Sequence, residues 1–270
     1  MANERFYLRV LREAVVRSDI RLDDRVLVVA GGPLDSTMFD TIGLRNVVIS
    51  NVDEREEQGL NPSHTWEFAE AEDLPYEDQS FDVVAVHAGL HHCRSPHTAV
   101  AEMYRVARRT VIIIEARDSF LMRTAVNARL VPQYEVDGVA GYEACHGGGV
   151  QNTEIPNFIF RWTERELEKT VRSLDPAVEP NISYFYGLRL PDVRLGQIDR
   201  ARWKALALSA GGWAVRALFR IAPHQGNEFA AVIRTGDHLT LQPWIRRDPD
   251  TGGYKLDKQW CEARFKPLAR

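Results

Sequence analysis

The sequence predicts an α/β fold with a doubly wound, mostly parallel sheet. Four short apolar runs rich in β-branched residues lie at positions 26–30, 47–50, 82–86 and 111–114. Runs that are apolar on both faces are typical of parallel strands covered by helices on each side. The segments between them are long enough for helical crossovers, and a glycine pair follows the first run directly. Such a sheet binds its ligand at the carboxyl ends of its strands.

Helical periodicity accounts for the segments around these runs. Residues 4–18 repeat apolar side chains at helical spacing before the first run, and residues 96–109 do so between the last two. Thr163 and Glu166 form a capping box, which predicts that a helix begins there. The remaining expected elements are strands at 182–186 and 229–233 and an amphipathic helix at 201–221.

The chain changes character after residue 120, where regular patterns give way to a polar stretch centred on three consecutive glycines, Gly147, Gly148 and Gly149. Consecutive glycines suit a mobile loop, so we expect an insertion at 120–160 that contacts the substrate. The predicted organisation is an N-terminal helix (1–22), a ligand-binding domain (23–236) that carries this insertion, and a C-terminal tail (237–270).

Composition narrows the class of protein. The 38 acidic and 34 basic side chains give a formal net charge of -4, so nothing draws the chain as a whole to nucleic acid. Its three cysteines form no CxxC pair, which favours a reducing compartment. No apolar stretch reaches the roughly 18 residues that a membrane span needs, and the N-terminus has no leader-like apolar region. We therefore expect a cytoplasmic protein without a transmembrane segment.

Two strand ends carry the first candidate binding residues. Gly31 and Gly32 follow the first strand, but the surrounding sequence lacks the G-x-G-x-x-G pattern of dinucleotide-binding proteins. Asn51 ends the second strand, where its carboxamide could bond a ribose hydroxyl, and Asp53 is the rival for that role. The alternative is that Asn51 and Asp53 only cap the next helix.

The segment 66–109 carries a more specific pattern. It contains Glu70-Ala71, then "DLPY" from Asp73, "SFD" from Ser80, "LHH" ending in His91 and His92, and a helix ending in "RVA". In this order the motifs resemble the S-adenosylmethionine-binding core of the class I methyltransferases, in particular their ubiquinone-methylase-like, type 11 branch. The resemblance covers about residues 20–118 and does not extend to 120–157.

The resemblance implies a Rossmann-like, seven-stranded sheet and S-adenosyl-L-methionine as the cofactor. It places the methionine part of the cofactor at Ala30, Gly31 and Gly32, with His87 closing that side. The ribose would lie at Asn51, or at its rival Asp53. The remaining implied cofactor residues are Glu70 at the adenine amino group, Ala71 at the adenine ring and Glu72 beside them. The chain departs from the family by having Ala30 and Leu34 at usual glycine positions and Asn51 at a usual acid.

Histidines are the candidate catalytic residues. Methyl transfer to a hydroxyl requires a proton acceptor near the methyl group, and a histidine is half deprotonated near pH 6.5. We place this base at His92, with His91 and His146 as alternatives, and expect Glu115 or Asp118 to orient the ring. His91 and His92 are adjacent, and no ligand cluster joins them in the sequence, so no metal is expected.

The acceptor is predicted from the polar and aromatic residues of the insertion and its flanks. Aromatic rings and amides together suit a sugar or a glycosylated, polar natural product, with Tyr142 and Glu143 as further acceptor contacts. A phenolic or quinone-like small molecule is the alternative acceptor. A module that binds S-adenosylmethionine without catalysis is the alternative from another class, because the glycine motif is altered. Formation of a homodimer is left open.

Overall fold

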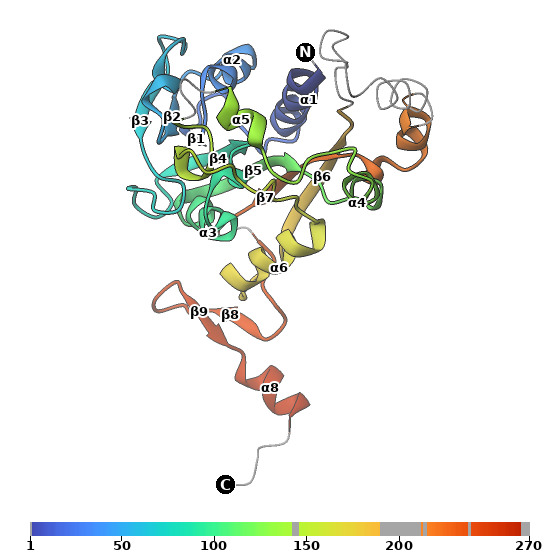
Figure 1. The fold of residues 1–270 in the computed structure, drawn as a ribbon. Helices are drawn as coiled ribbons and strands as arrows, with labels where there is room; N and C mark the ends of the chain where they lie inside the picture. Colours follow the sequence, from blue (N-terminus) through green and yellow to red (C-terminus); the bar gives the residue numbers. More distant parts are fainter. Residues whose placement is uncertain (1, 142–145, 190–211, 213–214, 237–238, 266–270) are drawn as a thin grey trace.

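A seven-stranded sheet in the order β3-β2-β1-β4-β5-β7-β6 forms the centre of the molecule (Figure 1). The computed structural model describes residues 2–141, 146–189, 212, 215–236 and 239–265. The strands are β1 (Val26–Val29), β2 (Val47–Asn51), β3 (Thr65–Phe68), β4 (Phe81–His87), β5 (Ala107–Ala116), β6 (Asn181–Gly187) and β7 (Glu228–Arg234). The pairs from β3 to β5 are parallel, and β7 runs antiparallel to both β5 and β6.

The apolar runs form the central strands because their side chains are buried on both faces of the sheet. Every residue of β1 is buried, and six consecutive residues of β5, from Thr110 to Glu115, are buried as well. Side chains on both faces of these strands pack under helices, which is why the runs do not alternate with polar residues. The predicted Rossmann-like, mostly parallel seven-stranded fold is confirmed.

Two pairs of helices cover the two faces of the sheet (Figure 1). Helices α1 (Ala2–Val16) and α2 (Pro33–Thr41) pack on one face. Helices α3 (Pro96–Val106) and α6 (Glu164–Leu174) pack on the other. The hydroxyl oxygens of Ser95 and Thr163 accept the amide hydrogens of residues at the starts of α3 and α6, so both helices begin at the residues that cap them.

Helix α1 is part of the main core rather than a separate N-terminal element. Tyr7 is buried, its hydroxyl donates to Asp35 on α2 at 2.9 Å, and its ring stacks on His87 at the end of β4 with centroids 4.4 Å apart. The helix predicted for residues 4–18 therefore reaches the edge of the sheet where a ligand would bind.

The helix expected at 96–109 is shorter than predicted. It ends at Val106, and β5 begins at the next residue, Ala107, which pairs with Phe81 of β4. Residues 107–109, which helical periodicity alone assigned to the helix, belong to β5 instead and extend it alongside β4. No turn separates α3 from β5.

The insertion contains regular structure, contrary to the loop expected from its glycines. It includes α4 (Phe120–Asn127), α5 (Val136–Ala140) and a 3-10 turn, η4 (Val150–Asn152). Ser119 caps α4 by accepting the amide of Met122. Helices of eight and five residues span at most about two turns, so they give little periodic signal. Tyr142 and Glu143 lie outside the described residues.

Three further 3-10 turns connect the main elements, η1 (Glu54–Glu57), η2 (Leu90–His92) and η6 (Pro223–Gln225). Beyond β7, a hairpin of β8 (Ile245–Arg247) and β9 (Tyr254–Leu256) leads to α8 (Lys258–Arg264), away from the sheet (Figure 1). Most of the amphipathic helix predicted at 201–221 lies outside the described residues. Within the described part of the chain, no helix has the length and apolar character to span a membrane.

Candidate active site

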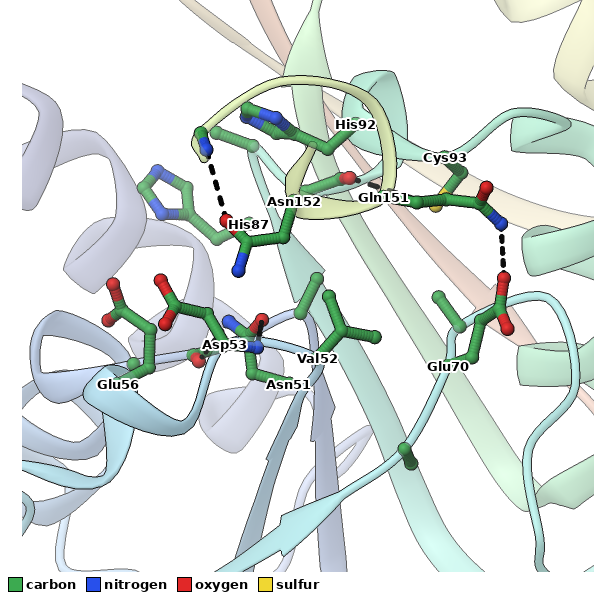
Figure 2. Close-up of a pocket in the computed structure, with 18 of the residues that line it drawn as sticks. Asn51, Val52, Asp53, Glu56, Glu70, His87, His92, Cys93, Gln151 and Asn152 are labelled. Atoms are coloured by element: carbon green, nitrogen blue, oxygen red, sulfur yellow. Dashed lines mark hydrogen bonds between the residues drawn. The ribbon is translucent and has the colours of Figure 1, made fainter. Parts of the chain in front are cut away.

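A cavity of about 360 Å³ opens at the carboxyl ends of β1, β2 and β4 (Figure 2). Parallel strands direct these ends to one edge of the sheet, which is where open α/β folds bind their ligands. The structure brings all of the residues predicted for the cofactor into the lining of this cavity: Ala30, Gly31, Gly32, Asn51, Asp53, Glu70, Ala71, Glu72 and His87.

The turn after β1 is tightly packed at Gly31. A Cβ atom there would lie 2.8 Å from the Val28 side chain, whereas one on Gly32 would meet the carboxylate at the end of the flexible Glu56 side chain. Ala30 has φ +49°, which an L-residue adopts at a cost of roughly 1–2 kcal/mol. Its Cβ faces Gly89, where an added Cβ would stand 2.7 Å away, so Ala30 fits because position 89 has none.

Asp35 is a buried carboxylate in the lining that the sequence did not identify. It accepts the Gly32 amide at 2.9 Å and the Tyr7 hydroxyl at 2.9 Å. Burial raises its pKa to about 6, although both hydrogen bonds favour the charged form. Its position three residues after Gly32, as in a capping box, was the available sequence signal.

The carboxamide of Asn51 is engaged at both ends. Its nitrogen donates to the Gly31 carbonyl at 2.8 Å, and its oxygen accepts the Asp53 amide at 3.1 Å. Asp53 in turn accepts the backbone amide of Arg55 and caps η1. Asn51 therefore holds the two strand-end turns together, and Asp53 is positioned beside it in the cavity (Figure 2).

The two glutamates that follow β3, Glu70 and Glu72, have different roles. Glu70 points into the cavity and accepts a hydrogen bond from the amide of Gln151 (Figure 2). Glu72 instead accepts the amides of Arg94 and Ser95 at 2.9 and 2.8 Å, so its carboxylate holds the segment that leads into α3. Ala71, between them, is buried.

The insertion covers one side of this cavity. Gly148, Gly149, Gln151 and Asn152 all line it, and the Asn152 side chain accepts the Gly148 amide at 3.0 Å. Gln151 and Asn152 have φ values of +49° and +56°, a left-handed pair that closes the turn. The insertion predicted to contact substrate thus also contributes to the cavity at the strand ends.

A second cavity of about 240 Å³ adjoins the first and shares His87 and Ala88 with it. Its lining comes from the ends of β4 and β5, from the insertion and from the start of β7. Burial lowers the pKa of His87 to about 4, so this ring is neutral where the two cavities meet.

The histidine pair stands at this junction, with His92 lining the first cavity and His91 the second. His91 Nδ1 lies 3.0 Å from the buried Glu115 carboxylate, and its Nε2 lies 3.3 Å from Glu135. Burial opposes the charge of His91, but the two carboxylates outweigh it and raise its pKa to about 10. His92 has one carboxylate contact, 3.5 Å to Glu135, and burial beside the charged His91 lowers its pKa.

Glu135 is the second residue of the site that the sequence did not reveal. The hydrogen bond from His91 lowers its pKa to about 2. Asn157, which is buried, donates to the same carboxylate at 3.2 Å, and its carbonyl accepts the Glu135 amide. Contacts between two segments of the insertion therefore hold Glu135 beside the histidines. No spacing pattern in the sequence predicts these contacts.

The family comparison agrees with this arrangement. Residues 34–114 match the family model described as a methyltransferase domain. The match contains the strand ends that form the first cavity beyond the glycine turn, and the strand order is that of the predicted fold. This segment is therefore similar to the methyltransferase domain of that family.

Curated relatives match the same part of the chain. Ubiquinone/menaquinone biosynthesis C-methyltransferases of Xanthomonas oryzae and Xanthomonas campestris are 31% identical over 109 residues, which is 36% of this chain and 43% of theirs. The chain thus matches less than half the length of these relatives.

Solved structures extend the similarity of fold over most of the chain. A Bacillus halodurans protein assigned as a methyltransferase is 14% identical with a TM-score of 0.53, covering 84% of this chain and 99% of its own. Magnesium protoporphyrin IX methyltransferase of Synechocystis, solved with bound S-adenosylhomocysteine, is 10% identical with a TM-score of 0.52, covering 87% and 84%.

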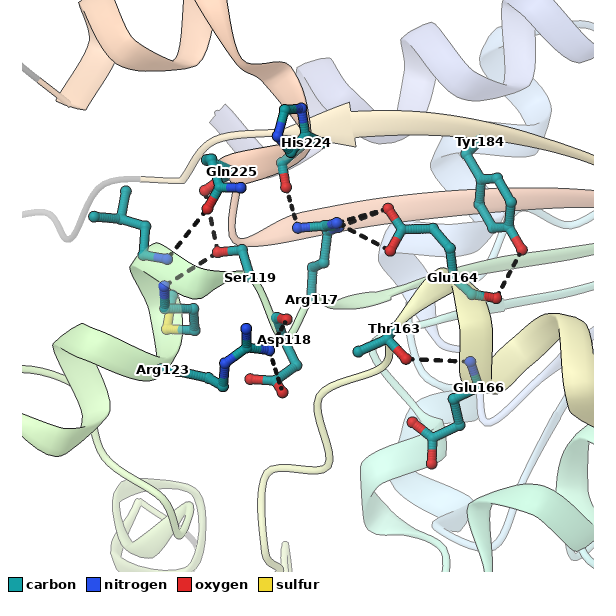
Figure 3. Close-up of polar contacts among 12 residues, drawn as sticks. Arg117, Asp118, Ser119, Arg123, Thr163, Glu164, Glu166, Tyr184, His224 and Gln225 are labelled. Atoms are coloured by element: carbon teal, nitrogen blue, oxygen red, sulfur yellow. Dashed lines mark hydrogen bonds and ion pairs between the residues drawn. The ribbon is translucent and has the colours of Figure 1, made fainter.

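Asp118 lies in a different polar network, which Figure 3 shows. Its carboxylate pairs with Arg123 at 3.2 Å, while the neighbouring Arg117 binds Glu164 and the His224 carbonyl. Of the two acids expected to orient a histidine, Glu115 is the one that contacts His91. Asp118 instead helps to join α4 to the sheet.

The remaining candidate base, His146, and two aromatic residues that flank the insertion, Trp162 and Tyr184, lie outside both cavities. His146 is 77% exposed, faces Glu154 at 3.9 Å and does not line either cavity. Trp162 is fully buried, and Tyr184 packs against the same core on the α3 and α6 side of the sheet. These two aromatic residues therefore pack in the core and line neither cavity. Their spacing in the sequence did not reveal which face of the sheet they occupy.

Proposed function

We propose that the protein is an S-adenosylmethionine-dependent methyltransferase that methylates a hydroxyl group of a small, polar acceptor such as a sugar or a glycosylated natural product. The observation that carries the proposal is the pair of cavities that meet at His87 and Ala88, with the histidine–carboxylate cluster at their junction. One cavity has the features of a cofactor site, and the other provides a separate space for an acceptor.

We assign the first cavity to the cofactor along its whole length. The ammonium group of its methionine part would face Asp35, the buried acid beside the glycine turn. The ribose would lie against Asn51 and Asp53, and the adenine against Glu70 and Ala71. This orientation directs the sulfonium methyl toward the junction of the cavities, where methyl transfer supplies the chemistry of the bound cofactor.

The lining of the second cavity favours a polar acceptor. It carries charged or amide side chains from Glu135, Arg161, Arg189, Asn227 and Glu228. Among the described residues that line it there is no Phe, Tyr or Trp on which a phenol or quinone ring would stack. Hydroxyl groups match such donors and acceptors, which is why we prefer a sugar-containing acceptor to the phenolic alternative.

The proton of the acceptor hydroxyl leaves during or before attack on the methyl group. His91 is poorly suited to take it, because both of its ring nitrogens face carboxylates within 3.3 Å. His92 has a single, longer carboxylate contact and lines the cofactor cavity. Acceptor ionisation therefore depends on His92, with Glu115 and Glu135 holding His91 beside it.

The test is a methyl-transfer assay with labelled S-adenosylmethionine on a panel of glycosides, vicinal diols and phenols, run beside calorimetric titration of the cofactor. We expect stoichiometric cofactor binding and transfer to a hydroxylated, non-aromatic acceptor. Cofactor binding without transfer to any acceptor of a broad panel would favour the non-catalytic module. Failure to bind S-adenosylmethionine or S-adenosylhomocysteine would overturn the proposal.

A further inference from the structure

Three possible metal ligands converge at the junction of the two cavities. The Nε2 atoms of His91 and His92 lie 3.3 and 3.5 Å from the same oxygen of Glu135, and the three ligand atoms all fall within 4.8 Å of one another. Ligand atoms about 2.0–2.2 Å from a tetrahedral ion stand roughly 3.3–3.6 Å apart. The His–Glu separations already match the spacing that an ion between these residues would require.

The residues behind these ligands are arranged as they are at built metal sites. His91 directs Nδ1 at the buried carboxylate of Glu115, whose other oxygen accepts the Leu90 amide at 2.7 Å. His92 lies beside the backbone of Gly149, and both residues line the first cavity. Metal-binding histidines commonly use their second ring nitrogen in this way, which fixes the ring and leaves the first nitrogen for the ion.

Charge also favours a cation at this point. Glu115 and Glu135 approach His91 from opposite ends of its ring, so the cluster holds two carboxylates beside two imidazoles that are neutral in their metal-binding form. Asn157 keeps the Glu135 carboxylate turned toward the rings. A divalent ion would neutralise the two negative charges without protonating either histidine.

We propose that His91, His92 and Glu135 bind a divalent transition-metal ion whose open fourth position takes the hydroxyl oxygen of the acceptor. Two imidazoles and one carboxylate suit zinc, iron, cobalt or nickel better than magnesium or calcium, which prefer oxygen ligands. The inference rests on the proposed function and refines it: His92 then acts as a ligand, and the acceptor hydroxyl ionises on the metal.

The reaction balances once the ion and the cofactor are bound. The acceptor hydroxyl would lose its proton to solvent, and its oxygen would form a bond to the methyl carbon as the sulfur–methyl bond breaks. The electron pair of that bond remains on sulfur, so the sulfonium and the metal-bound alkoxide become a neutral thioether and an ether. An acceptor with neighbouring oxygens, such as a vicinal diol of a sugar, would fill the fourth position with one oxygen, and expansion to five ligands would admit the second.

Two other His–Glu pairs serve as internal comparisons. His97 lies 3.4 Å from Glu166, and His146 lies 3.9 Å from Glu154. Each pair offers one imidazole and one carboxylate, and both histidines are more exposed than His91. They share the local chemistry but lack the second imidazole, so His97→Ala is the matched control.

The direct test is calorimetric titration of untagged, metal-stripped protein with Zn²⁺ and, separately, Co²⁺. We expect one ion per chain, binding weakened at least tenfold in Glu135→Gln and His92→Ala, and no change in His97→Ala. Glu115→Gln leaves the three ligands in place and should weaken binding by about 10–100-fold through loss of the outer carboxylate. Thermal unfolding and cofactor titration of each variant establish that it is folded.

Absence of stoichiometric binding in the wild type, or equal affinity in folded Glu135→Gln, would overturn the metal site. Treatment with a chelator followed by metal addition gives the second readout. Methyl transfer that resists the chelator, together with no ion binding, removes the metal and leaves His92 as the direct base of the proposed function. Loss of cofactor binding in untreated protein would overturn the proposed function, while the ion titration still decides the metal site.

Discussion

The two cavities differ in how the chain assembles them. The cofactor cavity is formed mainly by residues 30–93, where each strand end adds its contribution in the order of the sequence. The acceptor cavity combines residues from 87 to 228, including the insertion and the antiparallel strand β7. The first is therefore specified by local sequence at strand ends, whereas the second depends on tertiary contacts that could diverge without disturbing the sheet.

The largest expected effect separates the two cavities by function. His92→Ala should reduce methyl transfer by about 10²- to 10⁴-fold and leave cofactor affinity within a few-fold, because it acts on the acceptor proton rather than on cofactor contacts. Steady-state kinetics and calorimetry on the same preparations measure both quantities, with His97→Ala as the control. A full-rate His92→Ala enzyme would show that acceptor ionisation does not depend on this ring.

Variants of Asn51 test whether cofactor affinity depends on a direct contact with the ribose or on the hydrogen bonds that Asn51 makes within the protein. Asn51→Ala should weaken cofactor binding by about 1–3 kcal/mol, since it removes hydrogen bonds to the Gly31 carbonyl and the Asp53 amide. Asn51→Asp should weaken it as well, because a carboxylate has no hydrogen to donate to that carbonyl. If Asn51→Asp binds the cofactor like the wild type, a direct contact of residue 51 with the ribose determines affinity, and the hydrogen bond to the Gly31 carbonyl does not.

Asp35 should make cofactor binding pH-dependent. Its carboxyl has a pKa of about 6 in the structure, and a nearby ammonium group favours the ionised form. Binding below this pH must therefore expel a proton, so affinity should rise about tenfold between pH 5 and pH 7. Calorimetry in buffers of different ionisation enthalpy detects the released proton, and Asp35→Asn should abolish the trend. A flat profile in the wild type would place the ammonium elsewhere.

Gln151, which brings the insertion into the cofactor cavity, should give the smallest effect. Its amide occupies an oxygen of Glu70 that we assign to the adenine amino group, so the cofactor has to displace it. Gln151→Ala should strengthen cofactor binding about two- to fivefold, a fraction of the roughly 1.5–3 kcal/mol of a hydrogen bond to a charged group. Weaker binding in this variant would mean that Gln151 holds the cofactor instead of competing with it.

The parts of the fold that the sequence predicted are those with a strong periodic signal. Buried runs such as Val26–Val29 indicated strands, and Thr163 marked the start of α6 through its capping side chain. Helix α2 and strand β3 were not identified from periodicity, because α2 is short and β3 lies at the edge of the sheet with exposed residues at both ends. The resemblance to a family, rather than periodicity, indicated the third strand.

The site divides in the same way. Motifs after the strands located Glu70 and the histidine pair, since strand ends meet at one edge regardless of side-chain detail. Asp35 and Glu135 were not found, because each acquires its role from partners distant in sequence: Tyr7 is 28 residues from Asp35, and Asn157 is 22 residues from Glu135. Contacts of this kind are set by packing, on which a single sequence gives no direct information.

Through Tyr7, helix α1 contributes to one end of the first cavity. The family match begins at residue 34, so both this helix and the glycine turn lie outside it. Yet Tyr7 shields Asp35 from water and stacks on His87. Deleting α1 would hydrate the acid, return its pKa toward that of an ordinary aspartate, and leave His87 without its aromatic support. A truncated protein that kept the entire matched segment would thus lose the end of the cavity that we assign to the zwitterionic part of the cofactor.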